Sequence, residues 1–227
     1  MTPNQAAIPE QADDLSALRI TEIFLSLQGE SASVGWPTVF VRTTGCPLRC
    51  RYCDTAYAFS GGQRMGLDEV VSEVQSYGVR HVTLTGGEPL AQPASKTLLK
   101  RLCELPFVVS LETSGAISLE DIDPRVVKVV DIKTPDSGES HQNLESNVQW
   151  IRAGDQIKFV ICSRADYDWS RSQLDRMALP DGVEVLFSPS HEQLDARSLA
   201  DWIVADRLPV RFQIQLHKYL WGDEPGR

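Results

Sequence analysis

The sequence predicts an α/β fold, an incomplete (β/α) barrel of about six parallel strands preceded by a mobile N-terminal arm. Short apolar runs rich in β-branched residues alternate with stretches of helical pattern, which is typical of repeated βαβ units with right-handed crossovers. Polar residues follow nearly every run, as they do where strand-end loops form the functional face of such a sheet. A complete eight-stranded barrel typically needs about 250 residues, and the 227 residues of this chain also supply an arm and a cysteine-rich loop.

The expected elements follow in order along the chain. Residues 1–17 show no periodicity and are expected to form the arm, and residues 18–227 to form one domain. The apolar runs predict strands at 20–27, 38–43, 81–84, 107–111, 126–130, 156–161, 183–187 and 210–216. The stretches between them predict helices at 67–77, 94–104, 144–151, 169–177 and 195–205. Asp68 suits the first turn of the first helix, and Gly78 suits its end.

Composition and charge restrict the class of protein. Hydrophobic residues make up 42% of the chain and charged residues 23%, which is enough for a sizeable core. The net charge is −9 and the pI is about 4.9, so we expect no nucleic-acid partner. No apolar run approaches the ~18 residues of a membrane span, and the polar, acidic start of the chain lacks a secretory signal. We therefore expect a cytoplasmic location without membrane contact.

Three of the five cysteines crowd into one short segment. Cys46, Cys50 and Cys53 form a CxxxCxxC pattern, which suits a metal or redox site better than a disulfide framework. Structural zinc usually takes four ligands in two separated pairs, and no fourth Cys or His lies nearby at ligand spacing. Iron–sulfur clusters take Cys thiolates, and a cubane held by three of them leaves one iron open. A closed cluster or zinc site, with a fourth ligand from elsewhere in the fold, is the alternative.

The cysteine pattern, with Tyr52 as the aromatic residue before the third cysteine, resembles the signature of the radical S-adenosylmethionine (SAM) superfamily. Thr85–Pro89 (TGGEP), at the end of a predicted strand, is similar to that superfamily's glycine-rich element, whose glycines would allow positive φ and close backbone approach. The resemblance implies a [4Fe-4S] cluster held by Cys46, Cys50 and Cys53, with SAM at the open iron. One electron from the cluster would cleave SAM to methionine and a 5′-deoxyadenosyl radical that takes a hydrogen from the substrate.

Further segments narrow the resemblance. Ser26–Glu30 (SLQGE), Phe40–Arg42, Cys53–Thr55 (CDT) and Gln215–Tyr219 (QLHKY) together are similar to the 7-carboxy-7-deazaguanine synthase family, from about Arg19 to about Asp223. The family reaction converts 6-carboxy-5,6,7,8-tetrahydropterin to 7-carboxy-7-deazaguanine with loss of ammonia, requires magnesium and belongs to the 7-deazapurine (queuosine precursor) pathway. In this chain LHKY replaces the commoner THK element, and the tail beyond it also departs from the family pattern.

The resemblance also implies a role for each of a set of residues. Substrate contacts are implied for Leu27, Gln28, Gly29, Arg42, Thr85 and His217. Contacts to SAM are implied for Tyr52, Cys53, Asp54, Gly87, Glu88, Asp131, Ile132, Lys133, Ser188, Pro189, Ser190 and His191, and magnesium binding for Thr55. The implied partners are a pterin substrate, a reductant protein such as flavodoxin or ferredoxin, and a second copy of the chain in a homodimer.

Simpler interpretations stay open for several of these residues. Arg42 can clamp the substrate carboxylate in a bidentate fork, or form a surface salt bridge. Thr55 can hold magnesium or cap local backbone. Glu88 can neutralise the ammonium of SAM or orient its own loop, and Glu112 can hold an amino group or pair with a nearby cation. His217 can donate to the substrate or be a buried structural residue.

Two other functions stay open as well. Another radical SAM enzyme, such as a glycyl-radical activase, would share the cluster motif but not the SLQGE, CDT and HK segments. A non-catalytic iron–sulfur module would need no TGGEP element and would not bind SAM.

Overall fold

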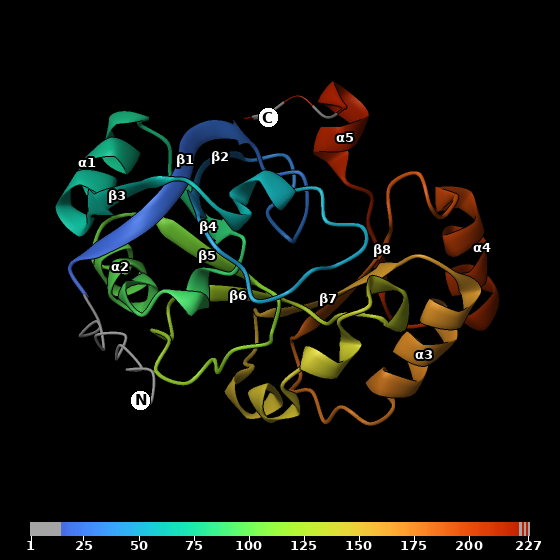
Figure 1. Ribbon diagram of the computed structural model, residues 1–227. Helices are drawn as coiled ribbons and strands as arrows, with labels where there is room; N and C mark the ends of the chain where they lie inside the picture. Colours follow the sequence, from blue (N-terminus) through green and yellow to red (C-terminus); the bar gives the residue numbers. More distant parts are fainter. Residues whose placement is uncertain (1–14, 223, 225, 227) are drawn as a thin grey trace, which may run out of the picture.

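One nine-stranded sheet organises the molecule. The computed structural model describes residues 15–222, 224 and 226, and Figure 1 shows the helices packed around the outside of the sheet. The order of the strands is β3-β1-β2-β4-β5-β6-β7-β8-β9. Their bounds are β1 (Ala17–Leu27), β2 (Pro37–Thr43), β3 (Gln63–Gly66), β4 (His81–Gly86), β5 (Val108–Thr113), β6 (Val127–Asp131), β7 (Gln156–Ile161), β8 (Glu184–Pro189) and β9 (Arg211–Phe212).

Most of this sheet is parallel. Every neighbouring pair from β2 through β4, β5, β6, β7 and β8 to β9 is parallel, while β1 runs antiparallel to both β2 and β3. The two edges are β3 and β9, so the sheet does not close on itself. The predicted α/β fold with an incomplete parallel barrel is confirmed, with the two-residue β9 as a short seventh parallel strand.

The helices agree with the sequence in three places and differ in three. They are α1 (Leu67–Ser76), α2 (Ala94–Cys103), α3 (Arg164–Leu174), α4 (Ala196–Asp206) and α5 (Leu216–Trp221). The first, second and fourth match the predicted helices to within about two residues. The third begins earlier than predicted because the Ser163 hydroxyl accepts a hydrogen bond from the Asp166 amide at 3.2 Å and caps its start. The predicted helix at 144–151 is a 3-10 helix, Glu145–Trp150.

The predicted strand at 210–216 is wrong in its second half. β9 ends at Phe212, and α5, which the pattern does not predict, begins at Leu216. The Leu216 amide donates to the Gly29 carbonyl at 2.9 Å instead of continuing a strand ladder. β3 is also not predicted, since its four residues carry no apolar alternation.

The predicted N-terminal arm falls largely outside the described part of the chain. Residues 1–14 are not described, and β1 already begins at Ala17, opposite Gly66 of β3. The sheet therefore starts one residue before the domain boundary predicted at residue 18.

The two faces of the central strands differ in polarity, and this difference positions the site. On the outer face Leu84, Leu111 and Phe159 are fully buried in the core beneath the helices. Because side chains alternate along a strand, the neighbouring positions point inward, and several are polar: Thr85, Glu112, Asp131 and Lys158. The interior of the open barrel is thus a polar chamber.

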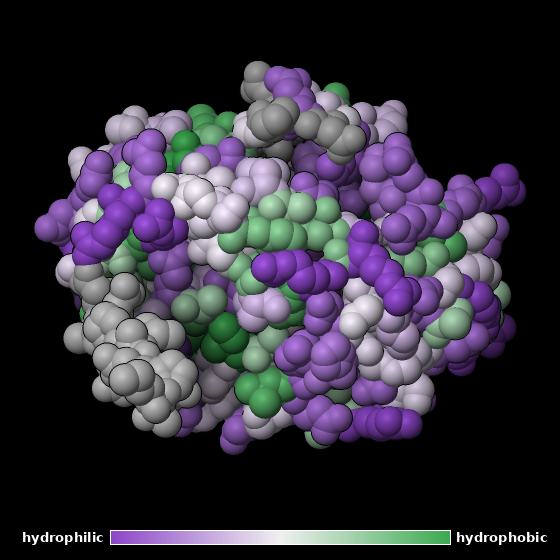
Figure 2. Space-filling model, in the orientation of Figure 1, coloured by the Kyte–Doolittle hydropathy of each residue, from purple (hydrophilic) through white to green (hydrophobic). Residues whose placement is uncertain are grey.

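The outer surface is that of a polar globular chain. Figure 2 shows hydrophilic side chains over most of one face, with apolar groups gathered in smaller patches. None of the described helices combines the length and the apolar character that a membrane crossing requires.

Candidate active site

A cavity of about 350 Å³ opens inside the barrel. Its walls come from three parts of the chain: the segment Gly45–Asp54 after β2, which we name the cysteine loop, the inner face of the strands, and the C-terminal segment around α5. Of the residues that the sequence singles out, it is lined by Leu27, Gln28, Gly29, Arg42, Cys46, Cys50, Tyr52, Cys53, Asp54, Thr55, Thr85, Gly87, Glu112, Asp131, Lys133, Ser190, His191 and His217.

The cysteine loop is fixed by backbone bonds to neighbouring segments. The Gly45 amide donates to the Ala58 carbonyl at 2.8 Å, the Glu88 amide to the Gly45 carbonyl at 2.8 Å, and the Arg51 amide to the Ser137 carbonyl at 3.0 Å. These bonds turn all three cysteines of the loop toward one cavity, where each thiol is half-buried and free of a disulfide.

The three thiols fit an iron–sulfur cluster better than a single ion. Within the described residues, no three Cys, His, Asp or Glu side chains converge closely enough to chelate one metal ion. A cubane makes a different demand, because each thiolate binds its own iron and the sulfur atoms stand farther apart. Three thiols at the rim of one cavity, with a lysine nearby to offset negative charge, match that demand.

The two glycines of TGGEP serve different purposes. Gly86 has φ +146°, in the region that favours glycine, as predicted. Gly87 is needed for space rather than for positive φ, since a Cβ there would lie 2.2 Å from the Gly45 carbonyl oxygen. The strand end of β4 can therefore pack directly beneath the cysteine loop.

Glu88 does not line the cavity. Its side chain is fully buried, and its carboxylate accepts hydrogen bonds from the Thr113 hydroxyl, from the Ser114 amide and hydroxyl, and from the Leu90 amide. The carboxylate is therefore directed into the protein and not toward the proposed SAM site. This arrangement fits the alternative in which Glu88 orients its own loop, because its hydrogen bonds link the end of β4 to the end of β5.

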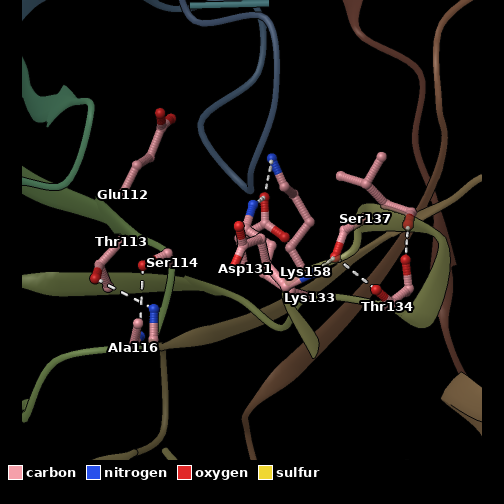
Figure 3. A network of polar contacts seen from close by, with 12 residues as sticks. Glu112, Thr113, Ser114, Ala116, Asp131, Lys133, Thr134, Ser137 and Lys158 are labelled. Carbon is pink, nitrogen blue, oxygen red and sulfur yellow. Dashed lines mark hydrogen bonds and ion pairs between the residues drawn. The ribbon is translucent and has the colours of Figure 1, made fainter. Parts of the chain in front are cut away.

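A buried charge network forms one wall of the cavity. Lys158, from β7, forms ion pairs with Glu30 and, at 3.5 Å, with Asp131; Lys133 lies 3.1 Å from the same Asp131 carboxylate. Figure 3 shows Lys158 and Lys133 converging on Asp131 from neighbouring segments, with Glu112 apart from them. Burial opposes the charge on Lys158, but Glu30 and Asp131 more than offset it and raise the pKa of Lys158.

A second polar group lies around Glu112. Its carboxylate accepts hydrogen bonds from the Thr85 hydroxyl at 2.9 Å and from the Gln28 side-chain amide at 3.2 Å. Burial raises the pKa of Glu112, and Lys158 acts in the opposite direction. The main chain of Gln28 is already engaged, since its N–H donates to the Trp36 carbonyl and its carbonyl accepts from Gly35. At Gln28 it is therefore the side chain, and not the main chain, that carries the polar groups of this wall.

Arg42 forms a salt bridge at the wall of the cavity. It lines the cavity, and its Nε also donates to Glu22 at 2.7 Å. The guanidinium carbon lies 5.7 Å from the ring centre of Phe24 and 5.8 Å from that of Tyr57. The guanidinium is thus oriented by one carboxylate and two aromatic rings.

Asp54 and Thr55 form a compact oxygen pair at the mouth of the cavity. The Thr55 hydroxyl donates to Asp54 Oδ1 at 2.7 Å, and it makes no capping bond to the 3-10 helix Ala56–Phe59 that follows. Enclosure disfavours the charge of Asp54, but the bond from Thr55 and the charge of Lys218 more than compensate, so the pKa of Asp54 is lowered. The capping interpretation of Thr55 is not what the structure shows.

The C-terminal segment closes the open side of the barrel. The imidazole of His217 packs directly on Gly29, where a Cβ would lie 2.1 Å from Nδ1, and burial lowers the pKa of His217. Beside it, the Gln215 side-chain amide donates to Glu30 at 2.8 Å. Residues nearly 200 positions apart thus form one wall of the cavity.

Besides Glu88, three residues implied as SAM contacts lie outside this cavity: Ile132, Ser188 and Pro189. Ile132 is buried in the apolar core, because alternation along the chain turns it away from Asp131 and Lys133. Ser188 is fully buried at the end of β8, and Pro189 lines a neighbouring pocket that shares Ser190 and His191 with the main cavity. Ser190 and His191, which follow them, do line the main cavity.

The sequence analysis gave no role to Glu30, Lys158 and Gln215, which are among the polar residues of the cavity wall. The signal for Lys158 was present, since a lysine interrupts the apolar run Gln156–Ile161 and a charge in a central strand requires a partner.

Comparison with known proteins agrees with this geometry. The Radical SAM superfamily model matches residues 40–132. A 7-carboxy-7-deazaguanine synthase from Chlorobaculum tepidum is 43% identical over 210 residues, which cover 91% of this chain and 96% of that protein. One from Thermoplasma acidophilum is 36% identical over 209 residues, which cover 91% and 99%. The crystal structure of QueE from Escherichia coli has the same fold, with a TM-score of 0.75 at 23% identity, over 88% of this chain and 95% of that one. Since the identity to these synthases extends over nearly the whole of both chains, this chain belongs to the 7-carboxy-7-deazaguanine synthase family of the radical SAM superfamily.

Proposed function

We propose that this chain is a carbon–nitrogen lyase that converts 6-carboxy-5,6,7,8-tetrahydropterin to 7-carboxy-7-deazaguanine with loss of ammonia, in 7-deazapurine (queuosine precursor) biosynthesis. The observation that carries the proposal is a single polar cavity shared by the three cysteines of the cysteine loop and the SLQGE, Arg42 and His217 segments. Sequence identity of 43% and 41% to two of the synthases, over 91% of this chain, favours this reaction over a glycyl-radical activase or a non-catalytic iron–sulfur module.

The part of the cavity beside the cysteine loop suits the cofactors. The cysteine loop would hold a [4Fe-4S] cluster, and Tyr52, Asp131 and Lys133 would border SAM. Among the described residues, the Tyr52 hydroxyl and Asp131 Oδ1 are buried without a hydrogen-bond partner. Buried polar atoms are usually hydrogen-bonded, so these two are suited to bind a polar ligand. SAM, when bound and reduced by one electron, supplies the radical that removes a substrate hydrogen.

The part of the cavity beside Gln28, Glu112 and Arg42 suits the pterin. A flat ring with several N–H groups needs acceptors in its own plane, and Glu112 and the Gln28 side chain offer them from a buried, rigid base. Arg42 would take the substrate carboxylate, since Glu22 and two aromatic rings hold its guanidinium toward the cavity. His217, held against Gly29, would close the site from the side and exclude water.

We also propose that Thr55 and Asp54 hold magnesium. Two oxygens 2.7 Å apart, one of them on a carboxylate that stays ionised, suit a hard cation. Thr55→Val removes the hydroxyl at nearly constant shape, while Thr55→Ser keeps it. We expect magnesium to stimulate turnover in the parent and in Thr55→Ser but not in Thr55→Val, at equal iron content. If Thr55→Val keeps the magnesium dependence of the parent, the hydroxyl is not a ligand.

The decisive experiment is anaerobic turnover of the reconstituted protein. The full chain is mixed with the tetrahydropterin, SAM, magnesium and a flavodoxin or ferredoxin as the proposed one-electron donor. We expect 7-carboxy-7-deazaguanine and ammonia in equal amounts, and no product from Cys50→Ala. Binding of SAM without any product from this pterin would point to another radical SAM reaction, and absence of SAM binding to a non-catalytic module. Sedimentation of the same preparation tests the proposed homodimer.

A further inference from the structure

Arg49, in the middle of the cysteine loop, folds its side chain back onto the loop that carries it. Its Nη1 donates to the Cys46 carbonyl at 2.8 Å and to the Leu48 carbonyl at 2.7 Å. The guanidinium carbon stands 4.3 Å from the ring centre of Phe59, in the 3-10 helix that follows the loop. One cation thus bridges the first cysteine of the loop to the element beyond its last.

The backbone of the same residue is anchored from a third direction. The Arg49 amide donates to the carboxylate of Glu139 at 2.7 Å, from the segment that follows β6. Side chain and main chain of Arg49 therefore tie together the cysteine loop, the 3-10 helix after it and the segment around Glu139. Leu48, which carries the second of these carbonyls and directly precedes the anchored amide, is almost completely buried.

Arg51 provides a natural contrast on the same loop. It carries the same charge two residues further on, yet within the described part of the chain its side chain forms no hydrogen bond or ion pair and only lies near Gly138. Arg49 and Arg51 therefore contribute equally to the net charge of the loop but unequally to its shape.

We propose that Arg49 is a positioning residue that holds the cysteine loop in its cluster-binding conformation before any cluster is present. A guanidinium suits this task because it is always charged, because its planar donors can serve two carbonyls, and because its face stacks on an aromatic ring. A loop ordered in advance loses little conformational entropy when three of its side chains bind a cluster. The inference rests on the cluster proposed above, but the order of the loop can be measured without it.

The test uses the full chain and three variants: Arg49→Gln, Arg49→Lys and the matched control Arg51→Gln. Hydrogen exchange of the protein without cluster is followed for peptides that cover the cysteine loop, with peptides from β4 and β5 as an internal reference for global folding. Iron and sulfide uptake is then measured during anaerobic reconstitution. The reduction potential of the cluster is determined by titration followed by electron paramagnetic resonance.

We expect Arg49→Gln to speed exchange in the loop by about tenfold, which corresponds to the loss of about one charge-assisted hydrogen bond, and to slow cluster uptake. Arg51→Gln should behave like the parent. Arg49→Lys keeps the charge and N–H donors for the carbonyls but loses the planar guanidinium that lies over Phe59, so it should fall between them. A cation near the cluster favours its more reduced state, and the Arg49 guanidinium is bonded to the carbonyl of a proposed cluster ligand, so Arg49→Gln should also lower the potential while Arg51→Gln leaves it near the parental value.

Equal loop exchange in the parent and in Arg49→Gln would overturn the proposal. So would equal effects of the two glutamine variants, since these would reflect net charge alone. If the loop loosens in Arg49→Gln while even the parent takes up no iron, the positioning role stands and the proposed cluster fails.

Discussion

Lys158 gives the sharpest test of the site, because its removal strands two buried carboxylates at once. Lys158→Met keeps the length of the side chain and removes the charge that Glu30 and Asp131 share. Breaking one side of a buried ion pair typically costs about 3–5 kcal/mol. We expect the lower end of this range, because Asp131 keeps Lys133 at 3.1 Å and Glu30 keeps the Gln215 amide at 2.8 Å.

The chain offers a matched control for this change. Lys128, one strand away in β6, pairs with Asp155 at 2.7 Å, and both side chains are buried. It points to the outer face of the sheet, away from the cavity, since Val129 and Asp131 line the inner face. Lys128→Met therefore breaks a buried ion pair of comparable depth without touching the site.

Urea unfolding of the cluster-free protein measures the cost. With a slope of about 3 kcal/mol per molar urea, a loss of about 3 kcal/mol lowers the midpoint by about 1 M. We expect both lysine variants to lose stability, but only Lys158→Met to lose turnover per folded, cluster-loaded molecule. The double variant Lys158→Met/Glu30→Gln should regain part of the stability, because it no longer leaves the Glu30 charge unpaired. An unchanged midpoint in Lys158→Met, or an equal loss of turnover in Lys128→Met, would refute this reasoning.

Three further results are expected. Alanine in place of any of the three cysteines of the cysteine loop should abolish iron uptake, whereas Cys103→Ala and Cys162→Ala should retain it, as iron analysis after reconstitution will show. Gly29→Ala places a Cβ 2.1 Å from the His217 ring, so pterin affinity should fall while the iron content stays at the parental level, and a titration with the pterin checks this. Burial holds the pKa of His217 below its usual 6.5, so below this pH the unfolded chain binds the proton more readily and stability falls. His217→Gln should remove this part of the loss in free energy of unfolding between about pH 7.5 and pH 5.5, and an identical loss in parent and variant would contradict it.

Local patterns predicted most of the fold, because they depend on neighbours in sequence. The apolar runs predicted six of the seven parallel strands, β2 and β4 to β8, to within about two residues, and the strand ends supplied Thr85, Asp131 and Lys133 to the cavity. These patterns could not predict which of two neighbouring residues at a strand end faces the cavity. Ile132 sits between two cavity residues but faces the core, and Glu88 follows the glycine pair but turns into the protein. Alternation at a strand end decides such cases, and a shift of one residue reverses the answer.

Contacts between distant residues account for the other omissions. Glu30 and Lys158 are 128 positions apart, and Glu30 and Gln215 are 185 apart, so no local pattern links them. The sequence did not predict α5 for a related reason, because its first residue, Leu216, donates a hydrogen bond to Gly29, far away in the sequence. In each case the partner is set by the tertiary fold, which places the loop after β1 beside β7 and beside the C-terminal segment.

The charge network also connects the two ends of the cavity. Glu30 belongs to the loop after β1 that carries Gln28 and Gly29, and Lys158 links it to Asp131. Asp131 in turn pairs with Lys133, whose ammonium lies 5.8 Å from the ring centre of Tyr52 in the cysteine loop. A continuous series of charged contacts thus runs from the proposed pterin end to the proposed cofactor end. Since these charges are largely shielded from solvent, a change at either end should alter the electrostatic balance at the other.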